Sequence, residues 1–357
     1  MKLKLNIWKI YFFSKFIYMY LALNVYSKFT SLGDTYRYLN GTPFELRSFL
    51  STDLMDFLAG TLSFYLGIFF ANVPFVILAF FGVYYPISKI DLNKNQLITL
   101  LLLLSFPNFG IWTSIASKES IAVFYMGLIL GFLIDLIKGN SNKNYLFFFL
   151  GIFLCWVFKA QYLIPVLAVL VFILIHNWLK LKNSEDLVIF LLIIIFSILS
   201  LYIYRYEINE LSLQMPEFFS FESNSTRENT FFLNDFDIFR NAPYGMFIAF
   251  FGPTINEAQN KIPHLLVFYE SMLLLFTFLF SISKSFKISL ASKEFNFYYI
   301  GIFFIFLFWI LFVHYPFGVL NPGSANRYRQ GFYSSIVILY YFLYTENIKN
   351  ILKYKKK

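Results

Sequence analysis

Residues 187–205 read LVIFLLIIIFSILSLYIYR, an apolar run that carries no charged residue before Arg205. A run of about 17–25 apolar residues is long enough to cross the hydrocarbon core of a bilayer as an α-helix. Similar runs recur along the chain, and we expect about ten spans, at 7–26, 58–85, 96–112, 120–137, 145–161, 162–179, 187–205, 264–282, 296–316 and 331–345. The expected fold is an all-α, polytopic transmembrane helical bundle, with one integral membrane domain over residues 1–357.

The composition excludes most soluble classes. Apolar residues make up 59% of the chain and charged residues only 14%, with 50 Phe and 26 Tyr. A soluble domain of this size needs a charged exterior, whereas lipid accepts an apolar one. The net charge of +9 does not indicate nucleic acid as a partner, because the lysines gather in connecting loops. The single cysteine, Cys155, excludes an intramolecular disulfide.

The lysines predict which loops face the cytoplasm. Lys and Arg are enriched in the cytoplasmic loops of membrane proteins. With ten spans, sixteen lysines fall on the cytoplasmic side and only four, Lys28, Lys118, Lys159 and Lys261, on the outer side. The tail KNILKYKKK at 349–357 then places the C-terminus in the cytoplasm, together with the N-terminus. This topology depends on a turn near Lys159, because reading 145–179 as one helix would reverse every later segment.

The arginines follow the opposite rule. All seven fall on the outer face or at its edge, at positions 37, 47, 205, 227, 240, 327 and 329. Arg binds phosphate and carboxylate with a planar, bidentate fork, whereas Lys acts as a point charge. The alternative is that these arginines pair with outer acids such as Glu207 and Glu228. Four outer segments, about 27–57, 107–119, 206–263 and 317–330, are therefore expected to form the site.

Two of these segments carry acid–base pairs. In SLGDTYRYLNG at 31–41, Asp34 is a candidate catalytic base and Arg37 a candidate substrate-binding residue. The alternative is a helix N-cap at Asp34 with Arg37 one turn later. In FPNFGIWTSIASKES at 106–120, Lys118 and Glu119 begin a span, where the helix N-terminus favours anions. The alternative there is a start capped by Ser117, and both interpretations are compatible.

The remaining candidates lie later in the chain. Lys159 either binds substrate or extends to the membrane interface. Arg240 and Glu257 flank Tyr244–Phe251, an apolar stretch too short to span, which predicts a re-entrant or interfacial helix. Arg327 and Arg329 follow the turn-forming NPGS at 321–324. If that segment is extended, both arginines face one way and could clamp a diphosphate, whereas in a helix they diverge.

The order of these motifs resembles that of O-antigen polymerase-like and GT-C-type membrane glycosyltransferases of bacterial surface-polysaccharide biosynthesis. The resemblance rests on Asp34 with Tyr36 and Tyr38, then on a Pro, Trp/Ser and Lys-Glu run, Pro253 before Glu257, and a small-residue turn into Arg327-x-Arg329. The Pro, Trp/Ser and Lys-Glu run comprises Pro107, Trp112, Ser114, Lys118 and Glu119. The chain differs in having Lys159 where an arginine is expected, and in lacking a proline soon after Arg329.

The resemblance implies a multi-pass protein of the bacterial inner membrane. It would join polyprenyl-diphosphate-linked repeat units on the periplasmic face, with Arg327, Arg329, Lys118 and Lys159 at the phosphates. The partners implied are polyprenyl-(di)phosphate-linked glycans and membrane lipid, with other polysaccharide-assembly membrane proteins as further candidates. No cofactor is expected, and no metal, because the three histidines are scattered. The alternatives are a single-sugar transferase that uses a polyprenyl-phosphate donor, a lipid-linked oligosaccharide flippase and a membrane O-acyltransferase.

Overall fold

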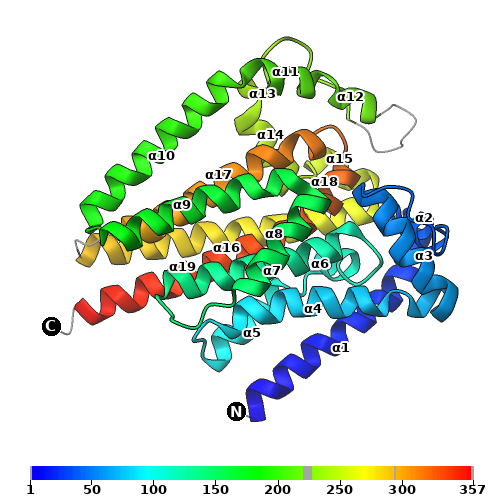
Figure 1. Cartoon of the computed structure of the whole chain (residues 1–357), viewed down its shortest axis with the longest axis horizontal. Helices are drawn as coiled ribbons and strands as arrows, with labels where there is room; N and C mark the ends of the chain where they lie inside the picture. Colours follow the sequence, from blue (N-terminus) through cyan, green and yellow to red (C-terminus); the bar gives the residue numbers. More distant parts are fainter. Residues whose placement is uncertain (1, 220–226, 293–294, 355–357) are drawn as a thin grey trace. The chain divides into compact units, whose positions relative to one another are not determined.

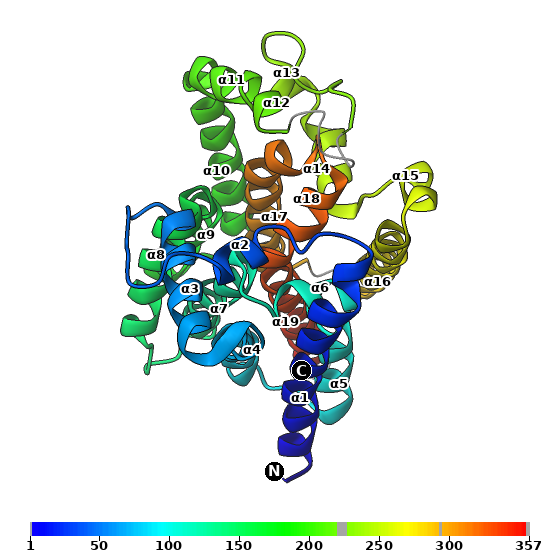
Figure 2. The same ribbon diagram turned by 90° about the vertical axis from the view of Figure 1, so that its right-hand side faces the viewer.

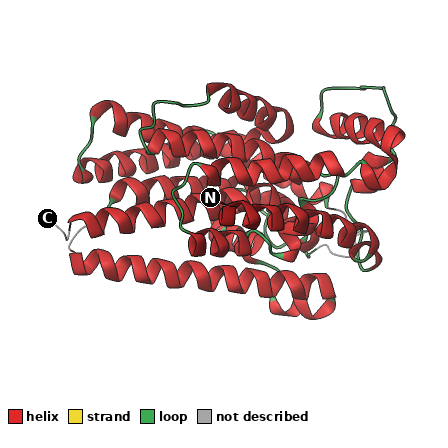
Figure 3. Ribbon diagram, turned by 90° about the horizontal axis from the view of Figure 1, so that it is seen from below, coloured by secondary structure: helices red, strands yellow, loops and turns green. Residues whose placement is uncertain are grey.

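The computed structural model describes residues 2–219, 227–292 and 295–354. Within these ranges the regular elements are all helices, joined by turns and irregular segments (Figure 3). The helical class expected from the sequence is thus confirmed. The chain forms two compact units, one of residues 1–163 and 330–338, the other of residues 164–329 and 339–357. The boundary lies inside the apolar run 145–179, so no shift in composition marks it.

The first unit contains eight α-helices and the start of a ninth. These are α1 (Lys2–Asn24), α2 (Thr35–Leu39), α3 (Ser51–Phe70), α4 (Val73–Ser88), α5 (Lys94–Leu103), α6 (Pro107–Trp112), α7 (Lys118–Ile137), α8 (Tyr145–Lys159) and the first residues of α19 (Gln330–Tyr354). Short 3₁₀ turns follow α1 at Tyr26–Lys28 and α8 at Ala160–Tyr162.

Helix α7 is the centre of the first unit, between α4 and α8 (Figure 1). Its middle is apolar, and 89% of its most apolar window is buried. Gly82 of α4 and Gly127 of α7 let the two backbones touch, because a Cβ on Gly127 would lie 1.9 Å from the Gly82 carbonyl oxygen. Close contact between small residues is typical of helix packing in membranes. A larger side chain at either glycine would force α4 and α7 apart.

The second unit contains the remaining helices. These are α9 (Leu163–Leu179), α10 (Asn183–Ile203), α11 (Arg205–Leu213), α12 (Met215–Phe218), α13 (Asp237–Arg240), α14 (Ala242–Phe251), α15 (Ile255–Asn260), α16 (Ile262–Ser292), α17 (Phe297–Gly318), α18 (Pro322–Tyr328) and the rest of α19. The apolar stretch Tyr244–Phe251 is helical, as part of α14, which packs on α17 (Figure 2). Gly245 of α14 lies against the ring of Tyr315 of α17.

Several helices are suited to a membrane. Six helical runs of the described residues are long and apolar enough to cross one: Ser51–Phe70, Lys118–Ile137, Tyr145–Leu179, Asn183–Ile203, Ile262–Ala291 and Phe297–Gly318. Helix α4 is apolar but shorter. The length and apolar composition of these helices identify the chain as a helical membrane protein. The count of ten spans and the cytoplasmic termini stay predictions.

Two of the expected spans are each divided into two helices. The stretch 58–85 forms the end of α3 and most of α4, separated at Ala71 and Asn72. The buried Asn72 amide donates to the carbonyls of Ile68 and Phe69, and its oxygen accepts from the backbone N–H of Ala116. The side chain of Asn72 thus bonds backbone groups at the break.

The prediction of a single helix over 96–112 is wrong, because this stretch forms two helices. Helix α5 ends at Leu103 and α6 begins at Pro107, so neither is long enough to span alone. The cause is Pro107, which has no N–H for a helical hydrogen bond and forces Phe106 into an extended backbone (ψ 136°).

The polar break expected near Lys159 is present. Helix α8 ends at Lys159, whose backbone (φ −155°, ψ 72°) is not helical, and α9 begins at Leu163 after one 3₁₀ turn. The 35-residue apolar run 145–179 is therefore two helices rather than one.

Sidedness gives a direct test of the predicted topology. We expect reporter fusions after Lys143 and Asn183 to read cytoplasmic, and a fusion at Asn321 to read periplasmic, because of the lysine distribution. Paired alkaline phosphatase and fluorescent-protein fusions measure this. A periplasmic reading at Asn183 would mean that 145–179 crosses once, and would remove the outer-face site.

Candidate functional site

The first outer segment holds Asp34 and Arg37 in an ion-pair network. Asp34 occupies the N-cap position of α2, but its side chain makes no capping hydrogen bond. It lies 3.5 Å from the guanidinium of Arg37 instead, which also lies 3.7 Å from the carboxylate of Asp56 on α3. The Tyr38 hydroxyl donates to Asp34, and its ring lies beneath Arg37. Arg37 therefore holds two carboxylates, from α2 and α3, in one place.

A polar cavity of 250 Å³ lies beside this network. It is lined by Arg37, Asn40, Gly41, Thr42, Glu45, Arg47, Asp53 and Asp56. The lining offers carboxylate oxygens as acceptors and guanidinium and amide groups as donors. Charges of opposite sign already pair within the lining, Arg37 with Asp56 and Arg47 with Glu45. This chemistry suits the hydroxyl groups of a neutral, polyhydroxylated ligand better than a free ion.

Sequence reasoning missed Asp53 and Asp56, because both lie in the first turns of α3, where acids are common for helix-dipole reasons. Only the fold shows that α3 faces the loop. Gly41 makes the approach possible, since a Cβ there would lie 2.4 Å from the carbonyl oxygen of Asp56. Gly60 touches the backbone of Gly41 in the same way.

Lys118 lies at the N-terminal end of two helices. It is the first residue of α7, whose start is capped by the Ser117 hydroxyl accepting from the Ser120 N–H, as the sequence predicts. Its ammonium donates to Ser51 Oγ (3.0 Å) and Thr52 Oγ1 (2.7 Å), in the first turn of α3. Helix N-termini carry partial positive charge and unbonded N–H groups. Lys118 adds a positive charge at this corner, beside these two ends, and the first turns of the same helices carry Asp53 and Glu119.

Glu119, the residue after Lys118, is buried in the first unit. Its backbone lies close to Gly331 at the start of α19. Besides Glu119, the buried polar residues of α6, the first turn of α7, their connection and the start of α19 are Asn108, Thr113, Ser114, Ser117, Ser120, Gln330, Ser334 and Ser335. Buried polar groups in membrane helices are costly and often functional.

Lys15 reaches the same corner and was not among the expected site residues. It lies within α1, is 1% exposed, donates to Thr113 Oγ1 (2.6 Å) and lies 4.3 Å from the ring centre of Phe109. The signal in the sequence was a lysine inside an apolar run, and such residues point into a bundle by default. Its contacts link α1 to α6.

Lys159 ends α8 and lies 5.5 Å from the ring centre of Tyr162, which is fully buried. The lysine is half-buried. This geometry is compatible with both interpretations of Lys159.

In the second unit, Glu257 is held by Arg227. The guanidinium makes two hydrogen bonds to the carboxylate, one of them 2.8 Å long, and a third to the carbonyl of Val319 (2.8 Å). The Arg227 N–H also bonds the carbonyl of Leu320. Glu257 further completes a capping box with Thr254. Both carboxylate oxygens of Glu257 already accept hydrogen bonds from the protein. Direct binding of a sugar by Glu257 is therefore less favoured than a role in positioning its neighbours.

The Arg227–Glu257 pair predicts a pH-dependent stability. Burial raises the pKa of Glu257, but the bonds and charge of Arg227, with the Thr254 N–H, outweigh it and hold that pKa below its ordinary value. A lowered native pKa stabilises the fold at neutral pH, and the gain is lost as the pH falls below the ordinary carboxyl range of about 4–5. Thermal unfolding of the Glu257→Gln variant should show a weaker dependence on pH than the wild type as the pH falls below about 5. Equal slopes would contradict the prediction.

Arg327 and Arg329 do not form the expected clamp. The segment is helical over α18, and Arg329 follows with helical backbone angles, so the two side chains diverge. Arg329 is 3% exposed and donates to the carbonyl of Phe250 and to Ser271 Oγ (2.8 Å). Arg327 is half-buried, with its guanidinium against the ring and hydroxyl of Tyr328. The extended alternative is therefore excluded, and Arg327 is the better placed of the two to meet a ligand.

Arg240 is the most exposed of the expected site residues, with 78% of its side chain accessible. It lies 3.7 Å from Asp237. The pKa of Asp237 is lowered mainly by the backbone N–H of Asn234, and Arg240 adds to this. Arg240 thus has a structural partner on its own short helix.

Within the described ranges, no group of three or more His, Cys, Asp or Glu side chains is placed to hold a metal ion. Comparison of the chain with protein-family models, with curated proteins and with solved structures found no match.

Proposed function

We propose that the protein is a membrane glycosyltransferase that joins polyprenyl-diphosphate-linked oligosaccharide repeat units on the periplasmic face. The observation that carries the proposal is the placement of Lys118 at the N-terminal ends of α3 and α7. Such an end binds phosphate through its N–H groups and its dipole, and a lysine strengthens the attraction. A lipid-linked diphosphate carries such phosphate groups and can reach a helical membrane protein from the bilayer.

The proposed reaction is a substitution at the anomeric carbon of the donor sugar. A hydroxyl of the acceptor forms the new glycosidic bond to that carbon, and the bond to the phosphate oxygen breaks. The electron pair leaves with the polyprenyl diphosphate, where negative charge increases. Lys118 would stabilise this charge more in the transition state than in the ground state, which accelerates the step.

Asp34 is the proposed acceptor of the hydroxyl proton. Its carboxylate is about one-third exposed, and it is held by Arg37 and Tyr38. The contacts with Arg37 and Tyr38 fix the direction of the carboxylate, as a base requires. The polar cavity lined by Arg37 supports this proposal, because a sugar there would be close to the same arginine.

A single-sugar transferase with a polyprenyl-phosphate donor is the second candidate. Its donor also releases a phosphate, so a phosphate site at Lys118 fits the polymerase and the single-sugar transferase equally well. Two cationic areas favour the polymerase, which must hold a donor and an acceptor diphosphate. The first unit supplies Lys118 and the second supplies Arg327. The flippase alternative has less support, since a lipid carrier needs no base such as Asp34.

Deletion of the gene tests the proposal. In a polymerase-deficient strain, each surface glycan carries a single repeat unit and the gel ladder of longer chains disappears. A truncated repeat unit that lacks one sugar would instead indicate the single-sugar transferase. Lipid-linked repeats that accumulate on the cytoplasmic face would indicate the flippase. An intact ladder would remove all three readings.

A further inference from the structure

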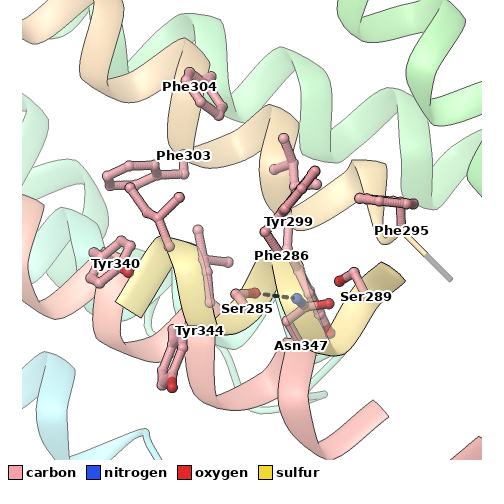
Figure 4. A pocket seen from close by; sticks show the side chains of 13 residues that line it. Ser285, Phe286, Ser289, Phe295, Tyr299, Phe303, Phe304, Tyr340, Tyr344 and Asn347 are labelled. Carbon is pink, nitrogen blue, oxygen red and sulfur yellow. Dashed lines mark hydrogen bonds between the residues drawn. The ribbon is translucent and has the colours of Figure 1, made fainter. Parts of the chain in front are cut away.

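An apolar cleft of 290 Å³ lies within the second unit, among α16, α17 and α19 (Figure 4). It is lined by Ile282, Ser285, Phe286, Ser289, Phe295, Tyr299, Ile300, Phe303, Phe304, Tyr340, Leu343, Tyr344 and Asn347. None of these residues belongs to the candidate functional site. Phe286 and Phe304 are each 54% exposed, so the cleft opens to the surface of the unit.

The two ends of the cleft differ in polarity. Phe303 and Phe304 lie at one end, whereas Ser289 and Asn347 lie at the other together with Phe286 and Phe295, nearer the C-terminal ends of α16 and α19 (Figure 4). The serine and asparagine side chains of the lining therefore lie toward one end of the cleft. An amphiphile would fit with its apolar chain beside Phe303 and Phe304 and its polar head near the helix ends.

Asn347 marks the polar end with an unsatisfied acceptor. The residue is only 7% exposed, and its amide nitrogen donates to Ser285 Oγ (3.2 Å). Its oxygen, also buried, has no hydrogen-bond donor among the described residues. Leaving a buried acceptor unpaired costs about 1–3 kcal/mol, so native structures usually supply a partner. A ligand that carries a hydroxyl group at this depth would supply it.

Positive charge flanks the same end. Lys284 and Lys287 lie in the turns of α16 that also carry Ser285 and Ser289, and both lysines are exposed. They point away from the cleft by helical spacing, but long lysine side chains reach the head-group layer. Clusters of lysine next to membrane helices attract anionic lipids. Lys349 contributes less, because it pairs with Glu346.

We propose that this cleft binds one anionic glycerophospholipid with a hydroxylated head group. One acyl chain lies along Phe303 and Phe304, a head-group hydroxyl donates to Asn347 Oδ1, and the phosphate lies at the level of Lys284 and Lys287. The proposal concerns a lipid held by the fold and does not depend on glycosyl transfer.

Lipid retention by the full-length protein tests the proposal. The protein is reconstituted in nanodiscs of phosphatidylglycerol and phosphatidylcholine in equal amounts, extracted with mild detergent and examined by native mass spectrometry. Phosphatidylcholine is the matched probe because its head group has neither net charge nor a hydroxyl. We expect the wild type to retain one phosphatidylglycerol. Asn347→Leu should reduce this retention about tenfold, as expected for one lost hydrogen bond.

Two serine variants of α16 make a matched pair. Ser285→Leu fills the cleft and should also reduce retention tenfold or more, whereas Ser283→Leu adds the same group to an exposed position outside the lining and should leave retention unchanged. Size-exclusion profiles show which variants fold. Equal retention of both lipids, unchanged retention in Asn347→Leu, or a wild-type protein that carries no lipid would each overturn the proposal.

Discussion

Replacement of Arg329 by alanine should lower the free energy of unfolding by about 3 kcal/mol and reduce the amount of protein in the membrane. The guanidinium is buried and bonds Phe250 of α14 and Ser271 of α16. Hydrogen bonds from charged groups contribute about 1.5–3 kcal/mol each, and the abandoned acceptors stay buried. Thermal unfolding in detergent and quantitative immunoblots measure the two effects.

Arg327→Ala is the matched control for this prediction. Arg327 lies two residues earlier but is half-buried, with its guanidinium against the ring and hydroxyl of Tyr328. We expect protein levels close to wild type in this variant, with a loss of glycan product if Arg327 meets the phosphate. An Arg329→Ala protein as stable as the wild type would contradict the structural role. Arg329→Lys should recover little, since a point charge cannot repeat the bonding geometry of the fork.

Replacement of Lys118 by alanine should reduce the rate of product formation about a hundredfold. This is the usual effect of removing one group that stabilises developing negative charge. The fold should tolerate the change, because Lys118 is half-buried and bonds two hydroxyl groups at the open end of α3. Transfer assays with membranes and lipid-linked substrate measure the rate, and Lys118→Arg should retain part of it.

Lys28→Ala is the control for Lys118. Lys28 is also an expected outer lysine, but it is exposed at the end of the 3₁₀ turn after α1. Its loss should leave the rate within about twofold of wild type, as for a solvated surface charge. An equal fall in both variants would indicate general electrostatic attraction instead of a phosphate site at α3 and α7. Full activity of Lys118→Ala would remove that phosphate site.

Local sequence features were sufficient to predict the helical class and the positions of several helix ends. The apolar runs predicted the membrane helices, and Ser117 was expected to cap α7, as it does. The polar break near Lys159 and the short helix at Tyr244–Phe251 were expected as well. These features depend on groups close in sequence, because helical hydrogen bonds join residues four apart.

The same reasoning failed where one residue changed the backbone inside an apolar run. Hydropathy averages over a window, so Pro107 was absorbed into an expected span at 96–112 that the structure divides. The relative direction of the Arg327 and Arg329 side chains could not be predicted either, since an extended segment and a helix were equally consistent with NPGSANRYR. The structure resolves this as α18, with the two guanidinium groups apart.

The sequence by itself determined the class of the protein and the residues that carry charge on its expected outer segments, because composition and period are properties of the chain alone. Only the tertiary structure decided their partners. Arg227 bonds Glu257 thirty residues away, Lys118 reaches Ser51, and Arg37 gathers Asp34 and Asp56. Sequence separation does not limit such contacts, since an ion pair or hydrogen bond depends on distance in space, and helix packing sets that distance.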